Sequence, residues 1–325
     1  MALPALGAVR RAFPASTLIL AAPASVAPLF EERTPVAPDE ILTVDRDRDV
    51  AQLRAAGADA VLLLTNSFGS AWVARRSGIP QRWGYRAAGR SMLLTRGVAR
   101  PKGTVHQVEY YLALVRGLGI EAPAGVDSRP TLQPSPQAQA RAGTLLASAG
   151  VDASATIVGF APGAAYGQAK RWPPDRVARV IEALARNGVT AVLVGARADR
   201  ETARAIESTL SPGTRVVDLI GRTSLRELVG VIGRCAAFVS NDSGAMHVAA
   251  AVGVPLTAIF GPTDERATAP AGASDVIVRD VFCRPCMLRD CPIDHRCMKR
   301  IDVDSVLTSV TAHLAGPPSP PGPPA

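Results

Sequence analysis

Two short stretches of this sequence combine residue types that suit a phosphorylated ligand. The first is Asp242-Ser243-Gly244, a polar turn between the apolar run 236–240 and a stretch of small residues. This order predicts a strand, a tight turn and a helix, and open parallel sheets bind ligands where strand carboxyl ends meet helix amino ends. Asp242 or Ser243 could cap the helix, while Gly244 lets a ligand approach a helix end that favours phosphate. A capped turn that binds nothing has the same sequence features.

The second stretch is the loop 161–174, which carries glycines, Lys170 and Arg171 and ends in two prolines. It follows a predicted strand, so its cations would lie at the same sheet edge as Asp242 and could hold a diphosphate. A solvated basic loop is the alternative, but two polar loops at one edge favour the phosphate site. His247 lies one turn into the helix that follows Gly244 and could face this site, or could serve packing.

Strand and helix patterns alternate along the chain, which predicts an α/β fold with parallel sheets. In the first part we expect strands at 17–21, 41–44, 60–65 and 82–85, and helices at 2–13, 26–32, 50–56, 70–77 and 106–118. In the second part we expect strands at 156–160, 191–194, 216–218, 236–240, 256–260 and 276–278, and helices at 138–148, 174–187, 200–210, 225–234, 244–252 and 303–314. The pattern predicts two Rossmann-like, doubly wound domains that face a cleft.

The domain boundary is predicted at a proline-rich linker, 121–137, which has no hydrophobic periodicity. The domains are then 1–137 and 138–315. The last ten residues, 316–325, are disordered by composition, because they consist largely of proline and glycine.

Four of the five cysteines lie close together, at Cys283, Cys286, Cys291 and Cys297, with His295 as a spare ligand. The first pair has the two-residue spacing of tetrahedral zinc sites, and four thiolates would close a structural site. An iron–sulfur cluster and unligated thiols are the alternatives. A chain of this length does not need a disulfide framework, so a reducing compartment fits better.

The net charge of +8 suits an anionic partner such as nucleic acid, a phosphorylated saccharide or an acidic membrane surface. Phe, Trp and Tyr make up only 4% of the residues, which disfavours nucleic acid because its binding uses stacking aromatics. No apolar run reaches 18 residues, so no transmembrane helix is expected. The stretch 10–24 imitates a signal peptide, but its charges are late and its apolar run is short, so we predict a cytoplasmic protein.

Three blocks resemble the heptosyltransferases of glycosyltransferase family nine: PGAAYGQAKRWP (162–173), SNDSGAMHVAAAVGVPLTAIFGPTDE (240–265) and CRPCMLRDCPIDHRCMKRI (283–301). The amino-terminal helix and HQVEYYLALVRGLG (106–119) are also similar, so the resemblance covers nearly all of the chain except its tail. It implies the GT-B fold and transfer of heptose from ADP-heptose, with inversion, to the inner-core heptose of lipopolysaccharide. It also implies catalysis without a metal ion at the cytoplasmic face of the inner membrane, with an acceptor-binding first domain and a donor-binding second domain.

The same resemblance implies roles for individual residues. Lys170 would contact the donor phosphates, Asp242 would hold heptose hydroxyls, and Ser243 and Gly244 would offer backbone amides to the diphosphate. Members of the family begin with a strand and a Gly-Asp turn, whose aspartate is the general base. This sequence starts inside the following helix, so we expect the base either to lie upstream of Met1 or to be absent, and without it the chain as written would transfer little heptose. Another family-nine transferase, or a nucleic-acid-binding protein with a zinc module, are the alternative functions.

Overall fold

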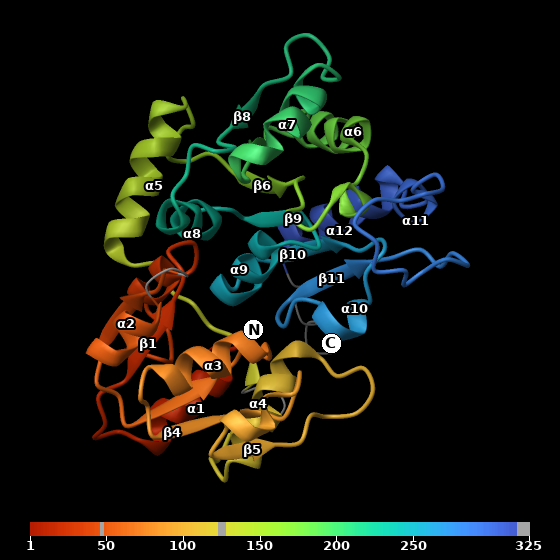
Figure 1. Cartoon of the computed structure of the whole chain (residues 1–325). Coiled ribbons are helices and arrows are strands. Elements are labelled where there is room, and N and C mark those ends of the chain that lie inside the picture. The colour runs from red at the N-terminus through yellow and green to blue at the C-terminus, as the bar shows by residue number, and fades with distance from the viewer. Residues whose placement is uncertain (46–48, 123–127, 317–325) are drawn as a thin grey trace, which may run out of the picture. The chain divides into compact units, whose positions relative to one another are not determined.

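A computed structural model describes residues 1–45, 49–122 and 128–316 of the chain (Figure 1). The chain divides into two compact units, Met1–Gln133 and Pro134 onward. Apart from Gly316, the predicted disordered tail lies outside the described residues. Among the helices that are described, none is both long and apolar enough to cross a membrane.

The first unit alternates strands and helices, as predicted. Its elements are α1 (Leu3–Ala12), β1 (Ile19–Ala22), η1 (Ala27–Glu31), β2 (Glu40–Thr43), α2 (Asp49–Ala55), β3 (Ala60–Leu63), α3 (Phe68–Arg76), β4 (Gln81–Tyr85), η2 (Arg90–Leu93), β5 (Arg96–Val98) and α4 (Gln107–Gly117). All described pairings in this unit's sheets are parallel, but β1 pairs with β2 in one sheet while β3, β4 and β5 form another. Among the described residues, the strands of this unit therefore form two separate parallel sheets.

The second unit contains the longer alternating series. Its elements are α5 (Pro136–Ser148), β6 (Ile157–Ala161), η4 (Gln168–Lys170), α6 (Pro174–Ala185), β7 (Thr190–Leu193), η5 (Arg197–Asp199), α7 (Arg200–Glu207), β8 (Val216–Asp218), α8 (Leu225–Gly233), β9 (Ala237–Asn241), α9 (Gly244–Val252), β10 (Leu256–Ile259), α10 (Glu265–Thr268), β11 (Ser274–Ile277), α11 (Arg296–Lys299) and α12 (Val303–Ala315).

The strands of the second unit form one parallel sheet in the order β11-β10-β9-β6-β7-β8. The chain therefore starts in the middle at β6, runs outward to β8, and then returns to β9 on the other side of β6. Such a reversal is a topological switch point, because the loops after β6 and β9 leave in opposite directions and open a crevice between them. The sheet's arrangement thus assigns the ligand crevice to the loops after these two strands.

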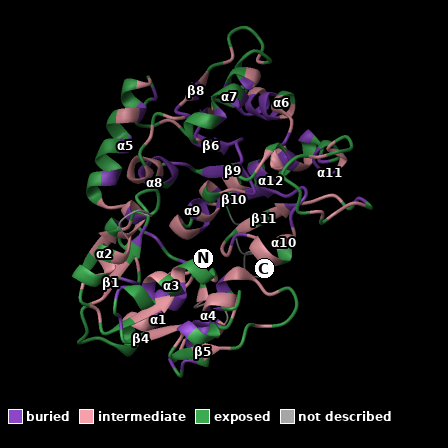
Figure 2. Cartoon of the chain, viewed as in Figure 1, coloured by how far each residue is buried: buried purple, intermediate pink, exposed green. Residues whose placement is uncertain are grey.

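The central strands are buried on both faces, which explains why their sequences are continuous apolar runs. Every residue of β6, β9 and β10 is buried, and these strands lie inside the second unit in Figure 2. Helix α6 begins at two prolines and buries Val177, Val180, Ile181 and Leu184, which share one helical face. These side chains and those of α12 belong to one hydrophobic core with β6 and β9. A rigid platform therefore carries the loops at the strand ends.

Candidate functional site

The two sequence-predicted loops meet at the switch point of the second unit. Strand β6 ends at Ala161, which pairs with Ser240 of β9, so the loop bearing Lys170 and the turn bearing Asp242 leave neighbouring strands. The Lys170 Nζ atom donates to Asp242 Oδ2 at 2.6 Å. The two side chains are only 11% and 8% exposed, so their ion pair is largely shielded from water.

A third group completes this cluster. The hydroxyl of Thr263, in the segment after β10, donates to the same Asp242 Oδ2 at 2.7 Å. Sequence reasoning missed Thr263 as a site residue. Its signal was its position, because it follows the strand next to β9 and lies at the same carboxyl edge of the sheet.

The side chain of Asn241 holds the Lys170 loop at both of its ends. Its Nδ2 donates to the Pro162 carbonyl at 2.6 Å, and its Oδ1 accepts from the Trp172 backbone N–H at 3.3 Å. Trp172 is buried, and its Nε1 donates to the Ile301 carbonyl at 3.1 Å. Both ends of the loop are therefore held, so Lys170 is positioned before any ligand arrives.

The amino end of α9 lacks the cap that the sequence predicts. Ser243 is the N-cap residue, but its side chain caps no helical amide and its Oγ lies 3.1 Å from Ser240 Oγ instead. The hydrogen bonds that Asp242 accepts come from Lys170 and Thr263, both at its Oδ2 atom, and neither donor is a helix amide. Expecting either side chain to cap the helix was therefore wrong, and the consequence is a helix end whose amides are left for another acceptor.

Gly244 and His247 are the other predicted residues at this helix end. Gly244 is exposed, and a Cβ at this position would meet open space, so a ligand can reach the backbone here. His247 is half-buried in the first turns of α9. Taken together, an ammonium group, an uncapped helix end and a carboxylate suit a ligand that carries both phosphate and hydroxyl groups.

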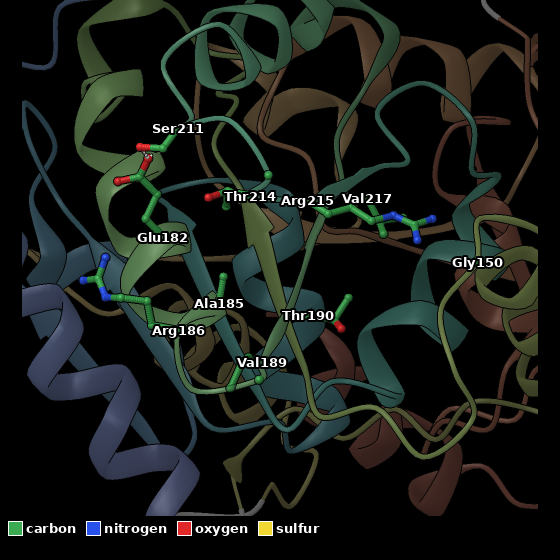
Figure 3. A pocket seen from close by; sticks show the side chains of 12 residues that line it. Gly150, Glu182, Ala185, Arg186, Val189, Thr190, Ser211, Thr214, Arg215 and Val217 are labelled. Atoms are coloured by element: carbon green, nitrogen blue, oxygen red, sulfur yellow. Dashed lines mark hydrogen bonds between the residues drawn. The ribbon is translucent and has the colours of Figure 1, made fainter.

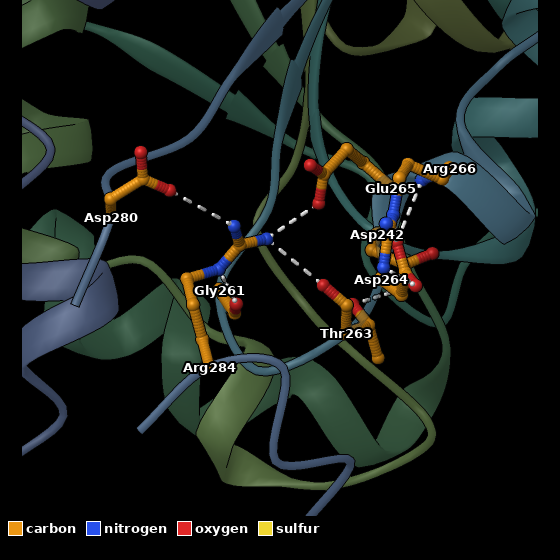
Figure 4. Close-up of polar contacts among 8 residues, drawn as sticks. All are labelled: Asp242, Gly261, Thr263, Asp264, Glu265, Arg266, Asp280 and Arg284. Carbon is orange, nitrogen blue, oxygen red and sulfur yellow. Dashed lines mark hydrogen bonds and ion pairs between the residues drawn. The ribbon is translucent and has the colours of Figure 1, made fainter. Parts of the chain in front are cut away.

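The cysteine block braces this site through Arg284, a residue that the sequence analysis did not single out (Figure 4). The Arg284 side chain is 7% exposed, and it donates to the Gly261 carbonyl at 2.8 Å and the Thr263 carbonyl at 3.0 Å. It also forms an ion pair with Glu265 at 2.7 Å. Because Thr263 bonds Asp242, the arginine fixes the loop that helps to orient this carboxylate.

The thiols of this block are all free. Burial raises the pKa of Cys297, and the charges that Cys283, Cys291 and Cys286 would carry raise it further. The backbone N–H of His295 donates to the Cys291 sulfur at 3.3 Å. Within the described part of the chain, however, no three cysteine, histidine or acidic side chains come together as a ligand set for a metal ion.

A separate hollow of about 500 Å³ lies at the other end of the sheet (Figure 3). Its lining includes Thr190, which begins β7, and residues beside the start of β8, so it lies at the strands' amino ends. There Glu182 accepts hydrogen bonds from the backbone N–H and hydroxyl of Ser211. The predicted donor-site residues do not line this hollow.

Comparison with known proteins gives the chain a family. A model described as glycosyltransferase family 9 (heptosyltransferase) matches residues 48–296. The chain belongs to glycosyltransferase family 9. It is similar to lipooligosaccharide heptosyltransferase 2 of Haemophilus influenzae, with 35% identity over 230 residues, which cover 68% of this chain and 65% of that protein. It is also 34% identical over 239 residues to lipopolysaccharide heptosyltransferase 2 of Salmonella typhimurium, covering 72% of this chain and 69% of that protein. The aligned part thus spans about two thirds of the length of these family 9 relatives.

Solved structures agree with the family 9 assignment. The chain superposes on the Escherichia coli ADP-heptose lipopolysaccharide heptosyltransferase II with a TM-score of 0.81 and 27% identity, covering 97% of this chain and 94% of that one. A family 9 transferase from Veillonella parvula gives a TM-score of 0.82 at 20% identity, covering 97% and 92%, which supports the fold alone. The predicted α/β fold of GT-B type is confirmed.

Proposed function

We propose that this chain is an inverting heptosyltransferase that moves heptose from ADP-heptose to the inner-core heptose of lipopolysaccharide. The names of its family 9 relatives support the choice of donor and acceptor class. The observation that carries the proposal is the shielded pair of Lys170 and Asp242 beside the uncapped end of α9. We assign donor binding to the second unit and acceptor binding to the first.

The donor residues act together in this proposal. Lys170 and the backbone amides of Ser243 and Gly244 receive the diphosphate, and Asp242 accepts hydrogen bonds from heptose hydroxyls. We also assign His247, in the first turns of α9, to the donor site. Lys170 and Asp242 bond each other at 2.6 Å, so binding redirects part of the lysine's hydrogen bonding from the carboxylate to a phosphate oxygen.

The chemistry follows from the charge of the leaving group. As the bond between the anomeric carbon and the phosphate oxygen breaks, its electron pair stays on ADP, and Lys170 and the helix end stabilise this charge. The acceptor hydroxyl attacks from the opposite face, which inverts the anomeric centre, and its proton passes to a general base. These residues provide the electrostatic part of the reaction, and no residue of this sequence is assigned as the base.

The acceptor is lipid-anchored and phosphorylated in this account, so the protein would contact the anionic inner membrane at its cytoplasmic face. The net charge of +8 supports such a contact. Exposed apolar side chains also concentrate in one segment, at Phe282, Met287, Leu288 and Ile293. Together these features fit a peripheral contact that needs no membrane-spanning helix.

A structural zinc ion in the cysteine block is a further part of the proposal. It is supported by the C-x2-C spacing of Cys283 and Cys286 and by the position of all four free thiols in one short segment. Binding would require Cys283, Cys286, Cys291 and Cys297, or three of them with His295, to draw closer around one point. The ion would hold the segment that carries Arg284.

The experiment that tests the function offers the purified protein several donors with one acceptor. Inner-core lipopolysaccharide that carries a single heptose is incubated with ADP-heptose, and product is followed by mass spectrometry. We expect the acceptor to gain one heptose and ADP to be released. Product from a UDP- or GDP-sugar in place of ADP-heptose would favour another family 9 transferase and contradict the proposal.

A further inference from the structure

We infer that Arg289 is a second cation for the donor diphosphate and acts beside Lys170. The inference rests on the proposed function, because it concerns the same site. Arg289 lies in the cysteine block, more than 100 residues along the chain from the Lys170 loop. Its place in the structure, rather than in the sequence, brings it to the donor site.

The backbone of Arg289 is built into the Lys170 loop. Its carbonyl accepts a hydrogen bond from the Ala169 backbone N–H at 2.9 Å. Gly167 passes so close that a Cβ there would lie 2.3 Å from the Arg289 carbonyl oxygen. A side chain at Gly167 would therefore separate the two segments. Because Ala169 precedes Lys170 directly, this hydrogen bond holds the Arg289 backbone next to the Lys170 loop.

The side chains of Arg289 and Lys170 share one aromatic ring. The Arg289 guanidinium carbon lies 5.2 Å from the centre of the Tyr166 ring, and the Lys170 Nζ lies 4.7 Å from the same centre. The Tyr166 hydroxyl donates to the Met287 carbonyl at 2.8 Å, which ties the ring to the cysteine block. Tyr166 thus contacts both positive groups, and each gains from cation–π attraction.

The two cations of the Lys170 loop already have carboxylate partners, so a diphosphate would require a further positive group. Lys170 is paired with Asp242, and Arg171 is paired with Asp199 at 3.3 Å. The positive charges of this loop are therefore already balanced by carboxylates. An incoming diphosphate adds at least two negative charges to this neutral cluster, and a further positive group is needed to compensate them.

The positive charge of the Arg289 guanidinium is available for a ligand. Of the other arginines in the cysteine block, Arg284 pairs with Glu265 and Arg296 pairs with Asp294. Arg289 is exposed, and no carboxylate among the described residues forms an ion pair with it. A guanidinium presents paired N–H donors that match two oxygens of a phosphate. The geometry therefore assigns it to the diphosphate rather than to the fold.

The test measures binding of ADP and of adenosine to the full chain and to three variants. Arg289→Gln removes the charge, Arg289→Lys keeps it, and Arg300→Gln removes a charge from an exposed arginine beyond α11 as the matched control. Thermal unfolding of each variant without ligand checks that the fold is intact. Salt concentration is held constant, because exposed charges are screened.

We expect Arg289→Gln to weaken ADP binding by about tenfold and Arg289→Lys to weaken it less, since a lysine retains the charge but loses the paired donors. Adenosine binding should not change in either variant, because it has no phosphate. Equal losses for ADP and adenosine, equal losses in Arg300→Gln, or unchanged ADP binding in Arg289→Gln would each overturn the inference. If the unaltered chain binds no ADP, the proposed function fails, and the inference fails with it.

Discussion

Replacing either partner of the Lys170–Asp242 pair should separate diphosphate binding from sugar binding. In Lys170→Met the ammonium group is lost while the side chain keeps a similar length. ADP then loses one charge-assisted hydrogen bond, which corresponds to about 1.5 to 3 kcal/mol, or roughly tenfold to a hundredfold in affinity. In Asp242→Asn the charge pair is lost, but Lys170 remains and no longer has a carboxylate competing for it.

We therefore expect Asp242→Asn to bind ADP at least as tightly as the unaltered chain, yet to lose transfer from ADP-heptose. Isothermal titration with ADP and a transfer assay measure the two properties separately. Stability provides a second check, since Lys170→Met leaves the Asp242 carboxylate, which is 8% exposed, with only the Thr263 hydroxyl. Removing one partner of a fully buried ion pair lowers the unfolding free energy by up to about 3 to 5 kcal/mol. We expect a smaller loss here, because both side chains keep some contact with water.

The double variant Lys170→Met with Asp242→Asn closes the cycle. If the two side chains interact as the structure describes, the double variant should be more stable than Lys170→Met alone, with a coupling energy of about 0.5 to 3 kcal/mol. Additive losses of stability would show that the pair does not form in solution. Weaker ADP binding in Asp242→Asn than in Lys170→Met would refute the assignment of the lysine to the diphosphate.

Three further predictions concern the surroundings of the site. If the cysteine block holds a structural zinc ion, Cys286→Ser should lower metal content and the unfolding temperature together, whereas metal-free purified protein of full stability would rule the ion out. Hydrogen bonds from Ser305 and Arg279 lower the pKa of Asp302, the N-cap of α12, so its stabilisation is present above the ordinary carboxyl pKa and lost as pH falls below about 4. Asp302→Ala should accordingly reduce the unfolding free energy at pH 7 more than at pH 3, and equal losses at both pH values would contradict this. In vesicle sedimentation, a quadruple serine variant at Phe282, Met287, Leu288 and Ile293 should release the protein from anionic vesicles, and unchanged binding would assign the contact to another surface.

The order of the strands limits what could be predicted from the sequence. Hydrophobic periodicity predicted the strands before Lys170 and Asp242. Because both residues follow the carboxyl ends of parallel strands, they were predicted to lie at the same edge of the sheet. That β6 lies directly beside β9 depends on the return of the chain across the sheet, which no local pattern encodes. The contact between these two side chains therefore had to come from the structure or from a family resemblance.

Side-chain competition explains the errors and omissions at the site. A serine or aspartate before a helix usually caps it, but Asp242 is used by Lys170 and Thr263, and Ser243 lies against Ser240. Arg284 looks like one of many arginines in a basic chain, and only its burial among carbonyl groups distinguishes it. These roles arise from contacts between segments far apart in the sequence, so composition and spacing do not reveal them.

The most direct test of the donor site is a crystal structure of the chain with ADP-heptose. We predict that the diphosphate lies within hydrogen-bond distance of Lys170 Nζ and the amides at the start of α9, with heptose hydroxyls on the Asp242 carboxylate. Density for the ligand elsewhere, such as in the hollow beside Glu182 and Ser211, would contradict it.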